Sequence, residues 1–194
     1  KLFADAQSML KMIIDEKWLT ARAVIGIYKA NAVNDDDIEV DAINGKTNRH
    51  FFHTIRQQTK KPAGQYNIAL ADFVKPKQEG NDYLGAFALT TGIGIDEHVA
   101  RFEKDHDDYS AIMLKALADR LAEAFAELLH KKVRTEYWAY AVNENLSTPE
   151  LIKEEYAGIR PAPGYPAQPD KTEKHTIWSL KKKKKNTGII LTES

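Results

Sequence analysis

The chain has 194 residues, with 28 basic and 28 acidic side chains and no cysteine. This length suits one domain with a sizeable core. Because the charges balance, no net field draws the chain to nucleic acid or to an anionic membrane surface, and neither is expected as a partner. The lack of cysteine excludes disulfides, thiolate nucleophiles and cysteine-ligated metal sites.

No stretch of the sequence approaches the roughly 20 apolar residues that cross a bilayer, and the amino terminus lacks the pattern of a signal peptide. We therefore expect a soluble, cytoplasmic protein. A helical pattern of apolar residues already runs from Leu2 and Phe3, which is typical of a chain cut between elements. We expect residues 1–194 to be one domain, truncated at both ends and excised from a longer modular protein.

The first quarter of the chain predicts a helix followed by antiparallel strands. Residues 1–16 have the helical pattern, and residues 22–29 are rich in β-branched and aromatic side chains, which favours a strand. "NDDD" predicts a turn, and "DIEVDA" alternates like the second arm of a hairpin. "INGKT" predicts the next turn.

The following segments predict one helix and two strands. "RHFFHTIRQQT" is expected to be a helix with Phe52 and Ile55 facing inward, ended by Pro62 and Gly64. "NIALADFV" and "DYLGAFALTTG" are apolar, contain aromatic residues and predict buried strands. "KPKQEGN" is expected to join them as a loop.

A helical period then runs from Asp96 to about Trp138 and predicts one long helix, marked by Leu114, Leu117, Leu121, Phe125, Leu128 and Leu129. Strands followed by helices predict an α+β fold, a mainly antiparallel sheet with flanking helices. A short helix is expected at 147–157, with Ser147 and Glu150 as a capping box and Gly158 as its left-handed terminator.

The stretch "GIRPAPGYP", residues 158–166, is unusually rich in proline and glycine. Its prolines push the residues before them toward extended backbone and leave carbonyl acceptors along one edge. Arg160 can hold a carboxylate through two hydrogen bonds, Gly164 can let a ligand approach the backbone, and Tyr165 offers a flat surface. A small zwitterionic or nucleoside-like ligand would suit these groups. A rigid, polyproline-like connector is the alternative explanation.

The same stretch resembles the activation domain of cobalamin-dependent methionine synthase. The resemblance also includes "RQQTKKPAG", "LADFVKPK", "DYLGAFALTTG", "NENLS" and "TEKHTIWSL", in the order of that family, and so covers nearly the whole chain. It implies a methionine synthase activation domain-like fold and a module that binds S-adenosylmethionine. Such a module supports reductive methylation of inactive cob(II)alamin, with the cobalamin held by a neighbouring module and the electron supplied by a flavodoxin or a reductase. It is part of a methyltransferase but is not expected to be catalytic in isolation.

The resemblance also implies site residues. Arg160, Ala162, Gly164 and Tyr165 stand at the arginine and glycine-tyrosine motif that contacts S-adenosylmethionine in the family, with Arg160 on the ligand's carboxylate. Glu123 and Glu154 match two acidic positions near that site. The ligand-contacting segments that flank this region in the family fall outside the chain, so part of the site is expected to be missing.

Other features have simpler interpretations. The five lysines at 181–185 indicate a solvated segment, with a docking surface for an acidic flavodoxin as a hypothesis. His106, beside two aspartates, and the pair His50 and His53 lack the further ligands that a metal site needs, so no metal is expected. A non-catalytic docking module for a cobalamin domain or flavodoxin is the alternative function.

Overall fold

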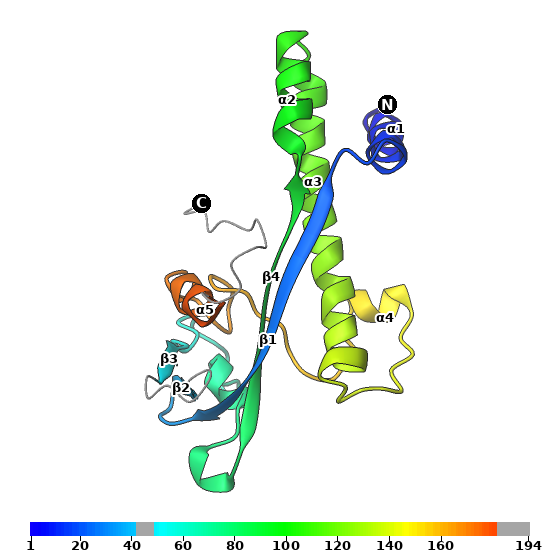
Figure 1. Cartoon of the computed structure of the whole chain (residues 1–194). Coiled ribbons are helices and arrows are strands. Elements are labelled where there is room, and N and C mark those ends of the chain that lie inside the picture. The colour runs from blue at the N-terminus through cyan, green and yellow to red at the C-terminus, as the bar shows by residue number, and fades with distance from the viewer. Residues whose placement is uncertain (42–48, 182–194) are drawn as a thin grey trace. The chain divides into compact units, whose positions relative to one another are not determined.

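The computed structural model describes residues 1–41 and 49–181. It divides into two compact units (Figure 1). The first unit comprises Lys1–Val24 and Ala88–Ser147, and the second comprises Ile25–Phe87 together with the described residues from 148 onward. Both boundaries in the first half of the chain fall inside strands, β1 (Thr20–Ala32) and β4 (Asp82–Ile93). Each unit is therefore built from separate stretches of sequence.

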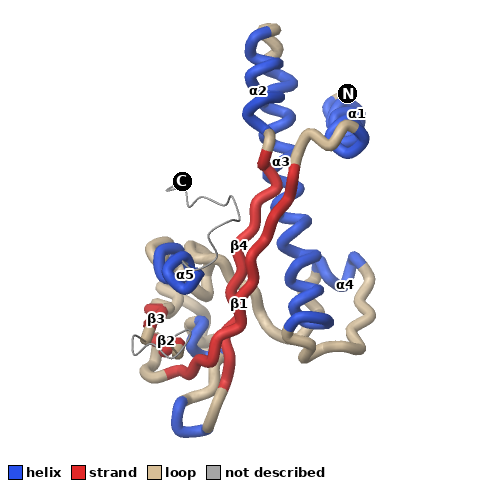
Figure 2. Tube along the Cα trace, in the orientation of Figure 1, coloured by secondary structure: helices blue, strands red, loops and turns tan. Residues whose placement is uncertain are grey.

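The strands form one four-stranded sheet in the order β3-β2-β1-β4, with helices accounting for most of the remaining regular structure (Figure 2). This confirms the predicted α+β class. The helix α1 (Leu2–Asp15) and the strands β1 and β4 lie where the sequence predicted them. Among the described residues, no helix combines the length and the apolar character that a membrane span requires.

Strand β2 (Asp37–Val40) pairs antiparallel with the end of β1, so the predicted hairpin is confirmed. The "NDDD" segment makes its turn, where the side-chain amide of Asn34 donates to Asp37 Oδ2 at 3.0 Å. The turn predicted at "INGKT" lies outside the described residues.

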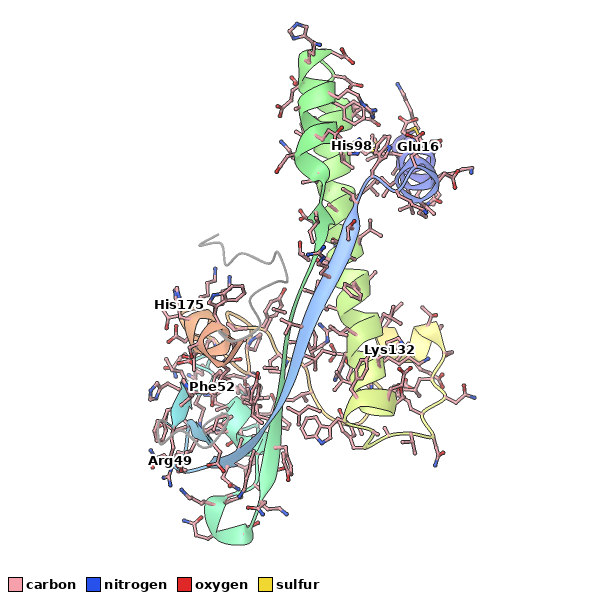
Figure 3. The ribbon with its side chains drawn as sticks, viewed as in Figure 1. Glu16, Arg49, Phe52, His98, Lys132 and His175 are labelled. Carbon is pink, nitrogen blue, oxygen red and sulfur yellow. The ribbon has the colours of Figure 1, made fainter. Side chains whose placement is uncertain are left out.

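The helix predicted at "RHFFHTIRQQT" is wrong, because its first residues form strand β3 (His50–His53). This strand pairs antiparallel with β2, with Phe52 opposite Ile38. The alternation of a strand decides which side chains are inside: Phe52 is 2% exposed, whereas Ile55, the other residue predicted to face inward, is 42% exposed. Figure 3 labels Phe52 on this strand.

The strand predicted at "NIALADFV" is also wrong, since Leu70–Phe73 form a short 3-10 helix, η2. Asp72 accepts a hydrogen bond from the amide of Ala69 at 2.9 Å, and Arg56 binds both of its carboxylate oxygens, at 2.6 and 2.9 Å. These local bonds stabilise a turn, and the apolar side chains of Leu70 and Ala71 still reach the core. The loop expected after them contains a second 3-10 helix, η3 (Lys77–Glu79), before β4 begins.

The core of the second unit lies between its strands, η2 and the last helix, α5 (Glu173–Lys181). The sequence patterns had not predicted α5. It packs against β3, and its Leu180 is 3% exposed. The buried members of this core are Ala30, Ile38, Val40, Phe52, Leu70, Ala71, Val74 and Leu180. The rest of the lysine run, 182–185, lies outside the described residues.

The long helix predicted from Asp96 is two helices, α2 (Ile95–Lys104) and α3 (Asp108–Lys132), which pack side by side (Figure 1). Apolar residues recur at helical spacing through both helices, so the sequence pattern did not indicate the break between them. His106 has a left-handed φ of 57° there, and the Asp107 side chain caps α3 by accepting from the amide of Ser110 at 3.0 Å. A π-helical turn, η4 (Val133–Tyr137), follows α3.

Trp18 is central to the core of the first unit. Its ring stacks on His98 of α2, with centroids 4.6 Å apart, and Arg101 lies 4.9 Å from the ring centre. Figure 3 shows His98 facing the end of α1, near the labelled Glu16, which accepts a bond from Trp18 Nε1 at 2.8 Å. The other buried members of this core are Met9, Ile13, Val99, Ala111, Met113 and Leu114.

In the described part of the chain, the α-helices α1, α2 and α4 (Thr148–Ile152) are each followed closely by a left-handed residue that is not glycine. Lys17, His106 and Glu154 have φ of 55°, 57° and 57°. After each of them, the next amide bonds back to a carbonyl five residues earlier, at 3.1 Å for Trp18, 2.9 Å for Asp107 and 3.1 Å for Glu155. This is the bond that closes a Schellman motif, a position where glycine is preferred. His106 is therefore a helix terminator.

Candidate functional site

The stretch from Gly158 to Pro166 leads from α4 (Thr148–Ile152) toward α5 in the second unit (Figure 1). Two successive turns form at residues 162–168. In the first turn the amide of Tyr165 donates to the carbonyl of Ala162 at 3.0 Å. Pro163 and Gly164 are its central residues, and Gly164 has φ of 99°, as the third position of a type II turn requires. The order Ala-Pro-Gly-Tyr thus specifies this turn directly.

The second turn follows at once. The amide of Gln168 donates to the carbonyl of Tyr165 at 2.9 Å, and Pro166 occupies the position in which proline is favoured. The amide of Gly164 donates to the carbonyl of Gln168 at 2.8 Å. The stretch is therefore folded back on itself and is not a straight polyproline-like connector. The carbonyls of Ala162 and Tyr165 each already accept one bond within it, so the predicted acceptor-rich edge is only partly open.

Position 164 needs glycine for two reasons. The φ of 99° is strained for any other residue, and a Cβ there would lie 3.1 Å from Cγ and 3.2 Å from Cε of Lys171. The space beside Gly164, which we expected a ligand to use, is filled by the aliphatic stem of Lys171. A ligand that approached the glycine backbone from this side would have to displace that stem.

The two turns are anchored to the core of the second unit. The carbonyl of Ala167 accepts a bond from the amide of Leu70 in η2 at 2.8 Å, and Gln168 beside it is 3% exposed. Leu70 belongs to the core cluster of this unit. The turns are thus fixed at Ala167 and Gln168, while Tyr165, where the two turns meet, is 64% exposed.

The predicted ligand-binding residues of the stretch differ in exposure. Arg160 is half-buried, and Ala162 is exposed on the first turn. Tyr165 forms an isolated antiparallel bridge with Gln168, which fixes its backbone while its ring remains open to solvent. A cation, an exposed aromatic ring and a tight turn are thereby placed within six residues.

Glu154 lies in the same unit and ends α4. Its amide bonds to the carbonyl of Leu151 at 3.0 Å, and the amide of Glu155 bonds to the carbonyl of Glu150 at 3.1 Å. The helix therefore ends much earlier than predicted, and Gly158, with φ of 88°, lies in a bend between the helix and the turns and is not the terminator. The side chain of Glu154 is exposed.

Glu123 lies on α3 in the first unit, whereas the other five predicted residues lie in the second unit. Its carboxylate is 70% exposed and pairs with Arg120, one helical turn earlier, at 2.8 Å. The structure thus brings Arg160, Ala162, Gly164, Tyr165 and Glu154 into one unit. The role predicted for Glu123 stays a prediction.

The sequence reasoning missed Gln168 and Lys171. Gln168 closes the second turn through its amide and binds Gly164 of the first turn through its carbonyl, and Lys171 packs on Gly164. A turn signal at "YPAQ", proline followed by a small residue, could have placed the first of them. Nothing in the sequence indicates that a glutamine there would be buried.

The histidines considered as metal ligands have other partners. His53 lies on β3, with Nδ1 2.8 Å from Asp37 Oδ1, and His50 Nδ1 lies 3.4 Å from the hydroxyl of Ser179. Within residues 1–41 and 49–181, no group of three or more potential ligands is arranged to hold a metal ion.

Comparison with known proteins relates the chain to a protein family and to solved structures. A family model described as "Vitamin B12 dependent methionine synthase, activation domain" matches residues 1–194. Among solved structures, the chain is similar to one titled "Crystal Structure of the MetH Reactivation Domain bound to AdoHcy", with 55% sequence identity and a TM-score of 0.87. The match covers 99% of this chain and 59% of that chain, so this chain spans about three fifths of the length of its relative.

Proposed function

The chain belongs to the family of vitamin B12-dependent methionine synthase activation domains, and from this membership we propose that it binds S-adenosylmethionine and presents it to a cobalamin held by another module. One observation carries the proposal: a relative with 55% identity over 99% of this chain was solved bound to AdoHcy. AdoHcy is what remains of S-adenosylmethionine after the methyl group has left. A site that binds AdoHcy therefore has the contacts for the nucleoside and the amino acid of S-adenosylmethionine.

The turns at residues 160–165 supply groups that fit this ligand. The guanidinium of Arg160 can bind the ligand's carboxylate through two parallel, charge-assisted hydrogen bonds. The exposed ring of Tyr165 can lie against the adenine or ribose. The backbone of Ala162 and Gly164 is already held in a tight turn, so the ligand would not have to order it, and at Gly164 the stem of Lys171 would move aside.

The two acidic residues suit the positive groups of the ligand, its sulfonium and its ammonium. Glu154 is the stronger proposal, because it shares a unit with the turns. Glu123 would have to exchange its pairing with Arg120 for the ligand. Both carboxylates are exposed, and an exposed ion pair contributes only about 0.2–1 kcal/mol.

The reaction that this binding would serve is a repair step of a methyltransferase. Cob(II)alamin returns to methylcobalamin by gaining one electron and a methyl group. A flavodoxin or reductase supplies the electron, and S-adenosylmethionine supplies the methyl group. The described part of the chain contributes ligand binding and orientation to this step. We propose a cytoplasmic setting, in which such electron donors are found.

Titration calorimetry with S-adenosylmethionine tests the proposal. We expect the wild-type protein to bind, and Arg160→Ala to weaken binding by about tenfold or more, because hydrogen bonds to charged groups contribute about 1.5–3 kcal/mol. Arg22→Ala is the matched control, since Arg22 is an exposed arginine of the other unit. It removes the same charge and should leave the affinity unchanged.

Two results would contradict the proposal. The first is a wild-type protein that releases no heat with S-adenosylmethionine and shows no ligand-dependent rise in its unfolding temperature. The second is equal affinity of the Arg160→Ala and Arg22→Ala variants. A protein that gave the first result but still bound a cobalamin module or a flavodoxin would be a docking module.

A further inference from the structure

We infer that Gln168 is a further ligand-binding residue of this site, whose side-chain amide donates a hydrogen bond to the nucleoside half of S-adenosylmethionine. The inference rests on the proposed function and deepens it. Gln168 is 3% exposed, and its Nε2 atom is buried with no hydrogen-bond partner among the described residues. On folding, this amide donor has lost its hydrogen bonds to water, and no acceptor in the described part of the chain has replaced them.

Such a donor is costly, and for that reason rare. Most buried polar atoms in folded proteins have a partner, and an apolar side chain of the same size would avoid the cost altogether. Glutamine at position 168 therefore destabilises the ligand-free protein relative to an apolar residue of the same shape. Residues that break a packing rule in this way are expected mainly at functional sites.

The backbone of Gln168 places its side chain beside the predicted ligand-binding residues. Its amide bonds to the carbonyl of Tyr165 at 2.9 Å, and its carbonyl accepts from the amide of Gly164 at 2.8 Å. Tyr165 and Gln168 are partners in an antiparallel bridge. Because directly opposed residues in such a pair project from the same face, the carboxamide of Gln168 shares its face of the turn with the ring of Tyr165.

The two side chains on this face differ sharply in exposure. Tyr165 is 64% exposed, whereas Gln168 is 3% exposed. Exposed side chains change rotamer within nanoseconds, so the tyrosine ring can adjust to a ligand without a change in the turn. A ligand seated against Tyr165 would then find an unused donor next to it.

The chemistry of the ligand decides which part of it the donor meets. S-adenosylmethionine offers acceptors on its carboxylate, on the ribose hydroxyls and on the ring nitrogens of adenine. Arg160 is proposed to bind the carboxylate of the ligand, and the ring of Tyr165, next to Gln168, suits the nucleoside. A ribose oxygen or an adenine nitrogen is therefore the acceptor, and AdoHcy carries the same ones.

The test is Gln168→Met, which keeps the length of the side chain and removes the donor. We expect the affinity for both S-adenosylmethionine and AdoHcy to fall by about tenfold, by the same factor, because the two ligands share the nucleoside. In the absence of ligand, we expect the unfolding temperature to rise by about 2–4 °C, because the unpaired donor is gone. Calorimetry and thermal unfolding measure the two effects separately.

Thr54→Val is the matched control for stability. Thr54 is a fully buried polar residue of the same unit, whose hydroxyl donates to the carbonyl of Asp36 at 2.7 Å and accepts from the amide of Ala71 at 3.1 Å. Its loss should lower the unfolding temperature. The dissociation constants, measured well below that temperature, should stay unchanged.

Three outcomes would overturn the inference. If wild-type protein binds and Gln168→Met binds equally well, the amide does not contact the ligand, and the proposed function stands. If Gln168→Met lowers both affinity and unfolding temperature, its role is to support the turn. If the wild-type protein binds neither ligand, the proposed function fails, and the inference fails with it.

Discussion

The guanidinium of Arg134 holds the carboxylate of Glu144 through two hydrogen bonds, from Nε to Oε2 at 2.6 Å and from Nη2 to Oε1 at 2.7 Å. Both side chains are buried, with 0% and 6% exposed. The carbonyl of Arg134 also accepts from the amide of Ala141 at 2.9 Å. The pair therefore fastens the segment after η4 to the π-helical turn η4 itself, in the first unit.

Breaking this pair from one side should be strongly destabilising. Arg134→Met or Glu144→Gln leaves a charge buried without its counter-charge, and we expect each to lower the free energy of unfolding by about 3–5 kcal/mol. The double variant Arg134→Met, Glu144→Gln should lose much less than the sum of the single changes. Urea unfolding measures all three. Additive losses would show that the two side chains do not depend on each other.

Acid should weaken the second unit through Glu39. This carboxylate is 6% exposed and pairs with Lys77 and Arg49, each at 2.5 Å, which hold the pKa of Glu39 below its usual range. A carboxylate with a lowered pKa stabilises the fold above the pKa of the unfolded chain, about 4.3, and this contribution is lost as the pH falls through the folded pKa.

The wild-type protein and Glu39→Gln should therefore differ most in unfolding free energy between pH 5 and pH 7. The difference should shrink as the pH falls below about 4.3. Urea unfolding at a series of pH values gives the comparison. A difference that is constant over the whole range would mean that the charge of Glu39 is unimportant.

Gly164→Ala should destabilise the turns by about 1–2 kcal/mol, the cost of a left-handed backbone for a residue with a Cβ. Gly80→Ala is the matched control, because Gly80 has φ of 105° and nothing lies within 4 Å of the position of its Cβ. Gly164→Ala should cost more than this control, because Lys171 must also move. In a Lys171→Ala background the two costs should become similar, as thermal unfolding can show.

Glu154→Gly should stabilise the protein and weaken the ligand site. Glycine adopts the left-handed terminator conformation without strain, which we expect to raise the free energy of unfolding by about 0.5–1 kcal/mol. His106→Gly is the matched control, since His106 ends α2 with the same φ of 57°. Both variants should gain stability, and only Glu154→Gly should bind S-adenosylmethionine less tightly. Equal affinities in calorimetry would remove Glu154 from the site.

The elements that could be predicted from sequence are those whose pattern is local and long. Strands β1 and β4 and helix α1 carry their own periodicity, and the hairpin turn before Asp37 carries its own turn residues. Strand β3 could not be predicted in this way. Two adjacent phenylalanines show no period of two, and only the pairing of Phe52 with Ile38 decides which one is buried.

The break between α2 and α3 was missed for a related reason. Apolar residues recur at helical spacing on both sides of it, and a single left-handed residue, His106, is enough to separate the helices. The site shows the same limit. The motif from Arg160 to Tyr165 is contiguous in sequence and could be found there, whereas the burial of Gln168 depends on two folded turns and their contact with Leu70.

The passage of the chain between its two units, within β1 and again within β4, limits how the protein can be taken apart. A gene fragment with one start and one stop cannot encode either unit without part of the other, because the first unit has residues on both sides of 25–87 and the second has residues on both sides of 88–147. A protease cut between Val24 and Ile25 would split a strand to which both units contribute. To express one unit by itself, its separate segments would have to be joined by a linker. A simple truncation series would unfold both units and could not show which unit has which function.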